Sequence, residues 1–379
     1  MDPDLPPILA ARTARLVTLV EYQLIEKIVE SVRSGEGSTA WDVTKLADIA
    51  RLRATLERIL SDNWDHVLAE AQAVLDQAAA EGQSAANIDL TRADPNSRLT
   101  PMAGNGLTMI ALDTLRHLTT LPTFILRDTL DAYHAIMSAP VAELALGTAT
   151  KSEAMEHALA EFTRRGIRSF RDRSGRRWTI DAYTEMAVRT GAARAQRYGY
   201  QAQLMAAGYD LVQVSGHGYS CDKCTPWEGT ILSLTGQTPS GTHTMDNPLG
   251  GTATVTVAGT MEHAKQAGLF HPNCGHTFTL HIPGVSKPVT PHRDHATYEA
   301  SQRQRELERR IRAEKLSLAG TGKRTNRRIR RWQSEIRALL DDYPKLARQS
   351  DREQVRRPGR AYERRRPSAP VAPDVRVYT

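Results

Sequence analysis

The sequence predicts a mainly α-helical protein with a small α+β module in its second half. Apolar residues recur every three or four positions through most of residues 8–207, which is the period of a helix with one buried face. After Asp210 the pattern changes to short alternating runs, which favour strands. Beyond residue 290 arginine dominates and apolar positions thin to a narrow stripe, which predicts a weakly packed basic helical hairpin and a disordered arm.

Length and cysteine content limit the class of protein. At 379 residues the chain is long enough for two or three domains that each bury a core. Its three cysteines are an odd number, which argues against a secreted disulfide scaffold and for a reducing compartment such as a cytoplasm. Residues 1–4 lack a positive leader and no apolar run is as long as a membrane span, so we expect neither a signal peptide nor a membrane segment.

Residues 1–85 predict an N-terminal helical bundle. Apolar side chains stand at helical spacing over residues 8–32, and a longer pattern of the same kind occupies residues 41–78. Asp62 and Asn63 could interrupt the second pattern locally, although its apolar positions continue across them. We interpret the two patterns as an antiparallel helical pair, or as one long helix packed on a neighbour.

Residues 86–208 predict a central helical domain. A segment rich in Gly, Asn, Asp and Pro at residues 82–106 places a boundary before it. Helical spacing then returns in four segments, which are residues 107–118, 122–137, 153–165 and 179–207. An arginine-rich Ser-Gly turn at residues 171–178 separates the last two, and we interpret it as a turn docked by its tryptophan rather than as a phosphate site.

Residues 209–290 predict the small α+β module. Four runs alternate as strands do, at residues 211–214, 230–234, 252–257 and 277–281. A short helix is predicted over residues 261–267, where a glycine follows the last helical position. Residues 235–251 are a long insertion rich in Gly, Pro and Ser, which we expect to be mobile or bound to a neighbour.

Residues 291–345 predict a basic helical hairpin with helices over residues 298–319 and 326–340. Residues 346–379 predict a disordered basic arm, because their composition turns to Arg, Pro and Ser. The whole basic end, residues 293–366, contains 23 Lys and Arg against 11 Asp and Glu, while the rest of the chain is mildly acidic.

Such a charged end is attracted to phosphate or to an acidic protein surface in a sequence-independent, salt-sensitive way. The alternative is a solvated surface without a partner. The arginines that we expect to make the contact are Arg327, Arg328, Arg330, Arg331, Arg364, Arg365 and Arg366.

All three cysteines lie in two loops of the predicted α+β module. Cys221 and Cys224 are spaced so that two thiolates can reach one ion. Cys274 and His276 could complete a four-ligand set of the kind that zinc prefers. The sequence therefore predicts a possible zinc site.

Without a metal, hydrogen bonds and packing would hold the same loops, and their glycines and prolines would only turn the backbone. The residues that we expect to do this are His217, Trp227, His271 and Asn273, with Trp227 anchoring a small core. His217 or His271 could also replace His276 as the zinc ligand.

Several motifs stand in a characteristic order. They are the arginine-rich turn at residues 172–178, Ser-x-His at 215–217, Trp-x-Gly at 227–229, the loop 268–276, Pro-Gly at 283–284 and the charged run 302–312. This order resembles that of the phage minor capsid proteins, the head-morphogenesis group related to the F protein of phage Mu. The resemblance covers about residues 100–340.

The resemblance implies a structural component of the virion of a tailed phage. Such a protein is made in the cytoplasm of the bacterial host and lies inside the head near the portal. Its partners would be the portal or the major capsid protein, and its basic end would contact genomic DNA.

Two other classes of function stay open. One is a metal-dependent DNA-processing enzyme delivered with the genome, which would use His217, His271 and His276 around an ion. The other is a nucleic-acid-binding adaptor without a role in the virion. The sequence contains no phosphate loop, no nucleophile elbow and no carboxylate pair that stands out, so we expect no catalytic activity.

Overall fold

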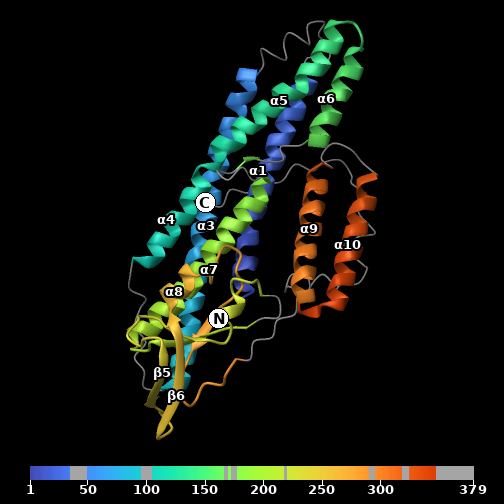
Figure 1. Cartoon of the computed structure of the whole chain (residues 1–379). Coiled ribbons are helices and arrows are strands. Elements are labelled where there is room, and N and C mark those ends of the chain that lie inside the picture. Colours follow the sequence, from blue (N-terminus) through green and yellow to red (C-terminus); the bar gives the residue numbers. More distant parts are fainter. Residues whose placement is uncertain are drawn as a thin grey trace.

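The computed structural model describes residues 1–34, 49–94, 105–165, 170–171, 177–216, 220–289, 295–317 and 324–346. Long helices form an elongated bundle, a five-stranded sheet packs at one end of it, and a helical hairpin lies beside it (Figure 1). This architecture confirms the predicted fold class. In the described parts of the chain, no helix is long and apolar enough to cross a membrane.

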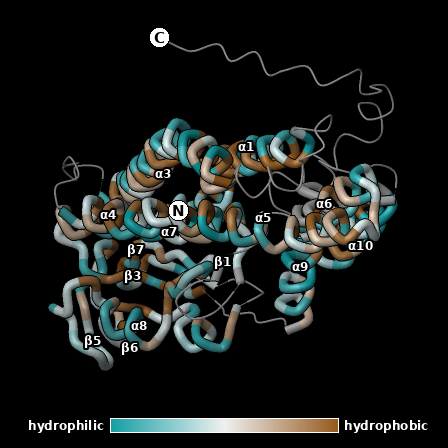
Figure 2. Tube along the Cα trace, turned by 90° about the horizontal axis from the view of Figure 1, so that it is seen from above, coloured by the Kyte–Doolittle hydropathy of each residue, from teal (hydrophilic) through white to brown (hydrophobic). Residues whose placement is uncertain are grey.

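The bundle is built on three helices, α1, α3 and α7, and three others extend it. The bounds are Leu5–Arg33 (α1), Ile49–Ala93 (α3), Gly106–Thr119 (α4), Leu121–Ala145 (α5), Lys151–Arg165 (α6) and Ile180–Ala206 (α7). Prolines begin α1 and α5, where a missing amide hydrogen breaks no helical bond. Hydrophobic and hydrophilic segments alternate along α1 and α3 (Figure 2), and the hydrophobic faces share one core with α7.

The helices α3 and α7 approach each other closely because glycines lie at their contact. A Cβ atom added to Gly82 would lie 1.9 Å from the carbonyl oxygen of Gln196, and one added to Gly199 would lie 2.1 Å from that of Ala79. Both neighbours are backbone atoms, which cannot rotate away as a side chain can. The two helices therefore pack backbone against backbone at this point.

The sheet has the strand order β5-β6-β4-β3-β7, in which β4 and β6 are parallel and the other neighbours are antiparallel. The bounds are Leu211–Val214 (β3), Ile231–Ser233 (β4), Gly241–Asp246 (β5), Thr252–Thr260 (β6) and Phe278–Leu280 (β7). The short helix α8, Met261–Gln266, follows β6. Two residues each form β1, Phe170–Arg171, and β2, Arg177–Trp178, which pair antiparallel around the arginine-rich turn.

Tyr200 of α7 joins the sheet to the bundle. Its hydroxyl donates a 2.6 Å hydrogen bond to Asp89 of α3 and accepts a 2.8 Å bond from the amide of Leu280 in β7. Its ring packs edge-on against Phe278, with 5.6 Å between the centroids. One fully buried side chain thus contacts both long helices and the sheet.

The helices α9, His295–Ser317, and α10, Arg324–Asp342, form the predicted hairpin. Arg303 of α9 makes a 2.6 Å ion pair with Glu335 of α10. A small apolar cluster packs at one end of the hairpin, formed mainly by Ala300, Leu340 and Leu346. The predicted arm lies outside the described residues from residue 347 onward.

The structure differs from two sequence-based expectations. Residues 82–93, expected to belong to a boundary segment, continue α3, because Ala86 and Leu90 pack in the core under the sheet. The boundary after residue 85 therefore falls inside one helix. Residues 235–251, expected to be an insertion that is mobile or bound to a neighbour, contain β5, which pairs with β6 over its whole length. No residue of β5 is buried, so hydrophobic alternation could not reveal it.

Two carboxylic acids lie buried between α1 and α7. Glu21 is 2% exposed and Asp181 is 4% exposed. Burial first, and then the charge of Asp181, raises the pKa of Glu21 well above its ordinary value. The folded state therefore binds this proton more tightly than the unfolded chain does. The resulting stabilisation is complete below the pKa that Glu21 has in the unfolded chain. It is lost as pH rises through the pKa of Glu21 in the folded state.

We expect Glu21→Gln to stabilise the protein by about 1–3 kcal/mol near neutral pH, because the amide has the shape of the protonated carboxyl and no charge. The gain should vanish at about pH 4, where the native carboxyl is itself neutral. Thermal unfolding at both pH values measures it, with Glu26→Gln on the exposed side of α1 as control. A gain that does not depend on pH would contradict the assignment.

We expect Gly82→Ala to destabilise the protein by about 1–3 kcal/mol or more, because the added methyl group meets the backbone of α7. The sign of this change is informative, because at an exposed helix position alanine is more stabilising than glycine by about 1 kcal/mol. Urea unfolding measures the change. Ser84→Ala, at an exposed position of the same helix, should have little effect.

Candidate metal centre

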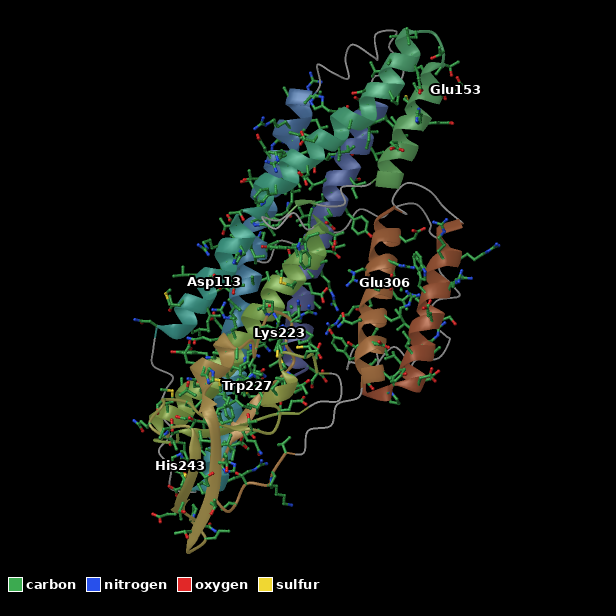
Figure 3. The ribbon with its side chains drawn as sticks, in the orientation of Figure 1. Asp113, Glu153, Lys223, Trp227, His243 and Glu306 are labelled. Atoms are coloured by element: carbon green, nitrogen blue, oxygen red, sulfur yellow. The ribbon has the colours of Figure 1, made fainter. Side chains whose placement is uncertain are left out.

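Two loops of the sheet module carry the cysteines. Cys221 and Cys224 lie between β3 and β4, where the amides of Cys224 and Thr225 donate to the carbonyl of Cys221 at 3.1 and 3.0 Å. This tight turn brings the two thiols toward each other. Figure 3 shows Lys223 and Trp227, which flank Cys224, beside the lower part of α7.

The second loop follows α8 and contains two non-glycine residues with positive φ. Phe270 has φ 60° and Asn273 has φ 67°, a conformation that asparagine tolerates better than phenylalanine. The side chain of Asn273 accepts a hydrogen bond from Arg189 of α7, and Phe270 lies under the guanidinium of Arg197 at 4.5 Å. Contacts with α7 therefore hold this loop in its conformation.

The two loops place five sulfur and nitrogen ligands in one cluster. Sγ of Cys221 lies 3.0 Å from Nε2 of His271, and Sγ of Cys224 lies 3.6 Å from Sγ of Cys274. Nδ1 of His276 lies 3.3 Å from Sγ of Cys274. Two groups of three share Cys224, and within each group all ligand atoms lie within 4.8 Å of one another.

His276 is held from behind by a buried carboxylate. Its Nε2 lies 2.9 Å from Oε1 of Glu228, which also accepts a hydrogen bond from the hydroxyl of Ser220. The carbonyl of His276 accepts a 3.3 Å bond from Arg197. All four of these side chains are buried, so the imidazole has one defined orientation, with Nδ1 toward the sulfurs.

The pKa values of the groups in and beside the cluster shift in different directions. The hydrogen bond with Cys224 lowers the pKa of Cys274, helped by His276, and the same bond together with burial raises the pKa of Cys224. Burial alone lowers the pKa of His276, but its bonds to Cys274 and Glu228 outweigh burial and raise it. Burial lowers the pKa of Arg197 to about 10, while the nearby thiols oppose that shift. The pKa of Cys274 therefore lies below that of an ordinary thiol, and the pKa of Cys224 lies above it.

A cavity of about 420 Å³ opens beside the cluster. It brings together segments that are far apart in the sequence. Its lining includes Pro3 and Asp4 before α1, Arg189 and Arg197 of α7, and Tyr298 and Arg305 of α9. All five residues of the cluster line this cavity. Cys221, His271 and Cys274 are half-buried, and Cys224 and His276 are buried.

The structure brings together the predicted ligands Cys221, Cys224, Cys274 and His276, and it adds His271 to them. Whether they bind zinc stays a prediction. Sequence reasoning missed Glu228, since a single acidic residue after a tryptophan carries no signal of its own. Glu228 becomes recognisable only through its bond to His276.

The other predicted residues lie as follows. Asn273 holds its loop through Arg189, as expected of a structural residue. Trp227 is half-buried, and its ring meets that of His263 edge-on at 5.7 Å. The predicted contact arginines of α10, Arg327, Arg328, Arg330 and Arg331, are not among the residues that line the cavity. His217 and the arm residues Arg364, Arg365 and Arg366 lie outside the described residues.

Comparison with known proteins identifies the family. The chain matches the family described as phage minor capsid protein 2 over residues 8–341. A structural protein of Lactococcus phage LL-H is 24% identical over 237 residues, which make up 59% of this chain and 62% of that protein. The matched region thus spans less than two thirds of that relative. No solved structure matches the chain significantly. Because the family match covers most of its length, this protein belongs to the phage minor capsid protein 2 family.

Proposed function

We propose that this minor capsid protein lies inside the phage head near the portal and binds packaged DNA through its basic C-terminal end. The observation that carries the DNA contact is the arrangement of α10. The helix buries Ile329 and Leu340 and exposes a group of closely spaced arginines, Arg327, Arg328, Arg330 and Arg331.

Ion pairs within the hairpin leave this group on its outer surface. Arg303 and Arg310 of α9 pair with Glu306, and Arg303 also pairs with Glu335 of α10. Arg328 reaches a carboxylate, Glu314, only at 3.8 Å and is 71% exposed. The arginines at the start of α10 therefore keep access to an external anion.

DNA fits this charge better than an acidic protein surface does. The basic end has 12 more positive than negative residues over positions 293–366. Phosphates on a duplex are dense and regular, and each contact releases a counterion, so no particular shape is needed for binding. A portal surface would have to match the hairpin in shape as well as in charge.

We expect replacing the four exposed arginines of α10 by glutamine to weaken DNA binding and to flatten its salt dependence. The log–log slope of affinity against salt should fall by up to about four, one for each lost phosphate contact. Fluorescence anisotropy with two unrelated duplexes measures this. The matched control removes four exposed arginines of the bundle, Arg15, Arg51, Arg58 and Arg92.

Equal losses in both variants would mean that net charge alone acts, and no binding at low salt would refute the DNA contact. Incorporation of both variants into heads, measured by mass spectrometry of purified particles, tests the portal instead. If the hairpin variant binds DNA normally but is missing from heads, the arginines contact protein. Absence of the native chain from both proheads and mature heads would contradict the proposed location inside the head.

We expect the purified protein not to cut DNA with magnesium, manganese or zinc. Both ring nitrogens of His276 are engaged, one with Cys274 and one with Glu228, so this imidazole is not available as a general base. A plasmid-nicking assay checks the expectation. Metal-dependent cleavage that disappears in His276→Ala would favour the alternative of a DNA-processing enzyme.

A further inference from the structure

We propose that Cys221, Cys224, Cys274 and His276 bind one structural zinc ion, which ties the two cysteine loops together next to α7. This inference does not depend on the DNA contact. It rests on the spacing of the ligands, on the support behind His276, and on the way α7 holds the second loop.

The spacing of the ligands is close to that of a zinc shell. Sulfurs about 2.3 Å from a tetrahedral ion lie about 3.8 Å apart, and a sulfur and a nitrogen lie about 3.6 Å apart. The observed distances are 3.6 Å between Cys224 and Cys274 and 3.3 Å between Cys274 and His276. Cys221 lies within 4.8 Å of Cys224, which belongs to both groups of three, so Cys221 is the thiol nearest to the second group that can add a fourth ligand.

The environment of the ligands is also that of a metal site. A zinc-bound histidine commonly donates its other ring N–H to a carboxylate, which fixes the tautomer, and Glu228 stands at that position behind His276. The backbone amide of His276 lies 3.4 Å from Sγ of Cys274 and donates to it, as amides do to bound thiolates. Glu228 is 3% exposed, so its carboxylate does not serve as a solvated surface charge.

Two histidines compete for the fourth position. His271 points Nε2 at Cys221 and has its Nδ1 2.8 Å from the carbonyl of Pro272, so it too has a defined orientation. It is half-buried at the edge of the cavity, whereas His276 is 1% exposed. The buried, carboxylate-supported imidazole makes the closed shell of a structural site, and we therefore assign His276 as the ligand.

Thiolate and imidazole ligands favour zinc over magnesium or calcium, which prefer oxygen. Three thiolates and one Zn²⁺ sum to one negative charge, and the buried guanidinium of Arg197 lies beside them as a counter-charge. Arg197 and Arg189 both extend from α7 to the second loop. An ion held by both loops therefore also fastens the first loop, and with it β4, to the bundle.

The test uses the full-length protein purified without a metal-affinity tag. We expect about one zinc per chain by elemental analysis and a thiolate charge-transfer spectrum after exchange with Co²⁺. Cys221→Ser and His276→Ala should lose both signals, and His271→Ala should keep them. A chelator should lower the Tm of the native protein and of His271→Ala, but not that of the variants that already lack the metal.

A second variant covers the case in which His276→Ala does not fold. Glu228→Gln keeps the shape of the carboxylate and should weaken zinc binding by about 10–100-fold, measured by competition with a chromogenic chelator. A metal-free native protein whose Tm is unchanged by added zinc and by chelator would overturn the proposal. Loss of metal in His271→Ala but not in His276→Ala would overturn the ligand set.

Discussion

The close contact between α3 and α7 is the constraint on which the rest of the structure depends. Glycine at position 199 lets α7 reach the backbone of α3, and two nearby residues of α7 reach the sheet module. Tyr200 bonds to β7, and Arg197 reaches the loop of His276. A change in the depth of this helix contact would therefore displace the joint with the sheet and the support of the cysteine loops together.

The polar groups buried along α7 serve different purposes at its two ends. Near its first turn, Asp181 lies against Glu21, and burial together with the charge of Asp181 raises the pKa of Glu21. Farther along, Arg197 is buried with a carbonyl, an aromatic ring and the thiols as neighbours. The first arrangement makes the stability of the bundle depend on pH. The second places a positive charge beside the thiols of Cys274 and Cys224.

The hairpin is organised by different electrostatics. Its arginines are exposed, so salt screens them and their pairs contribute little to stability, whereas the charges along α7 are shielded from solvent. One chain thus combines a bundle whose buried charges are shielded from solvent with a basic surface whose charges salt can screen.

The sequence by itself determined the helices, most of the strands and the pairing of two cysteine loops, because helical period, alternation and the Cys-x-x-Cys spacing are local properties. Tertiary structure alone decided that residues 82–93 stay helical, since Ala86 and Leu90 gain their core only from the sheet. It also decided that β5 forms, because an exposed strand is specified by its partner and not by its own residues. The site divides in the same way. The thiols are visible in the sequence, but Glu228 and the position of His271 depend on loops that meet only when α7 brings them together.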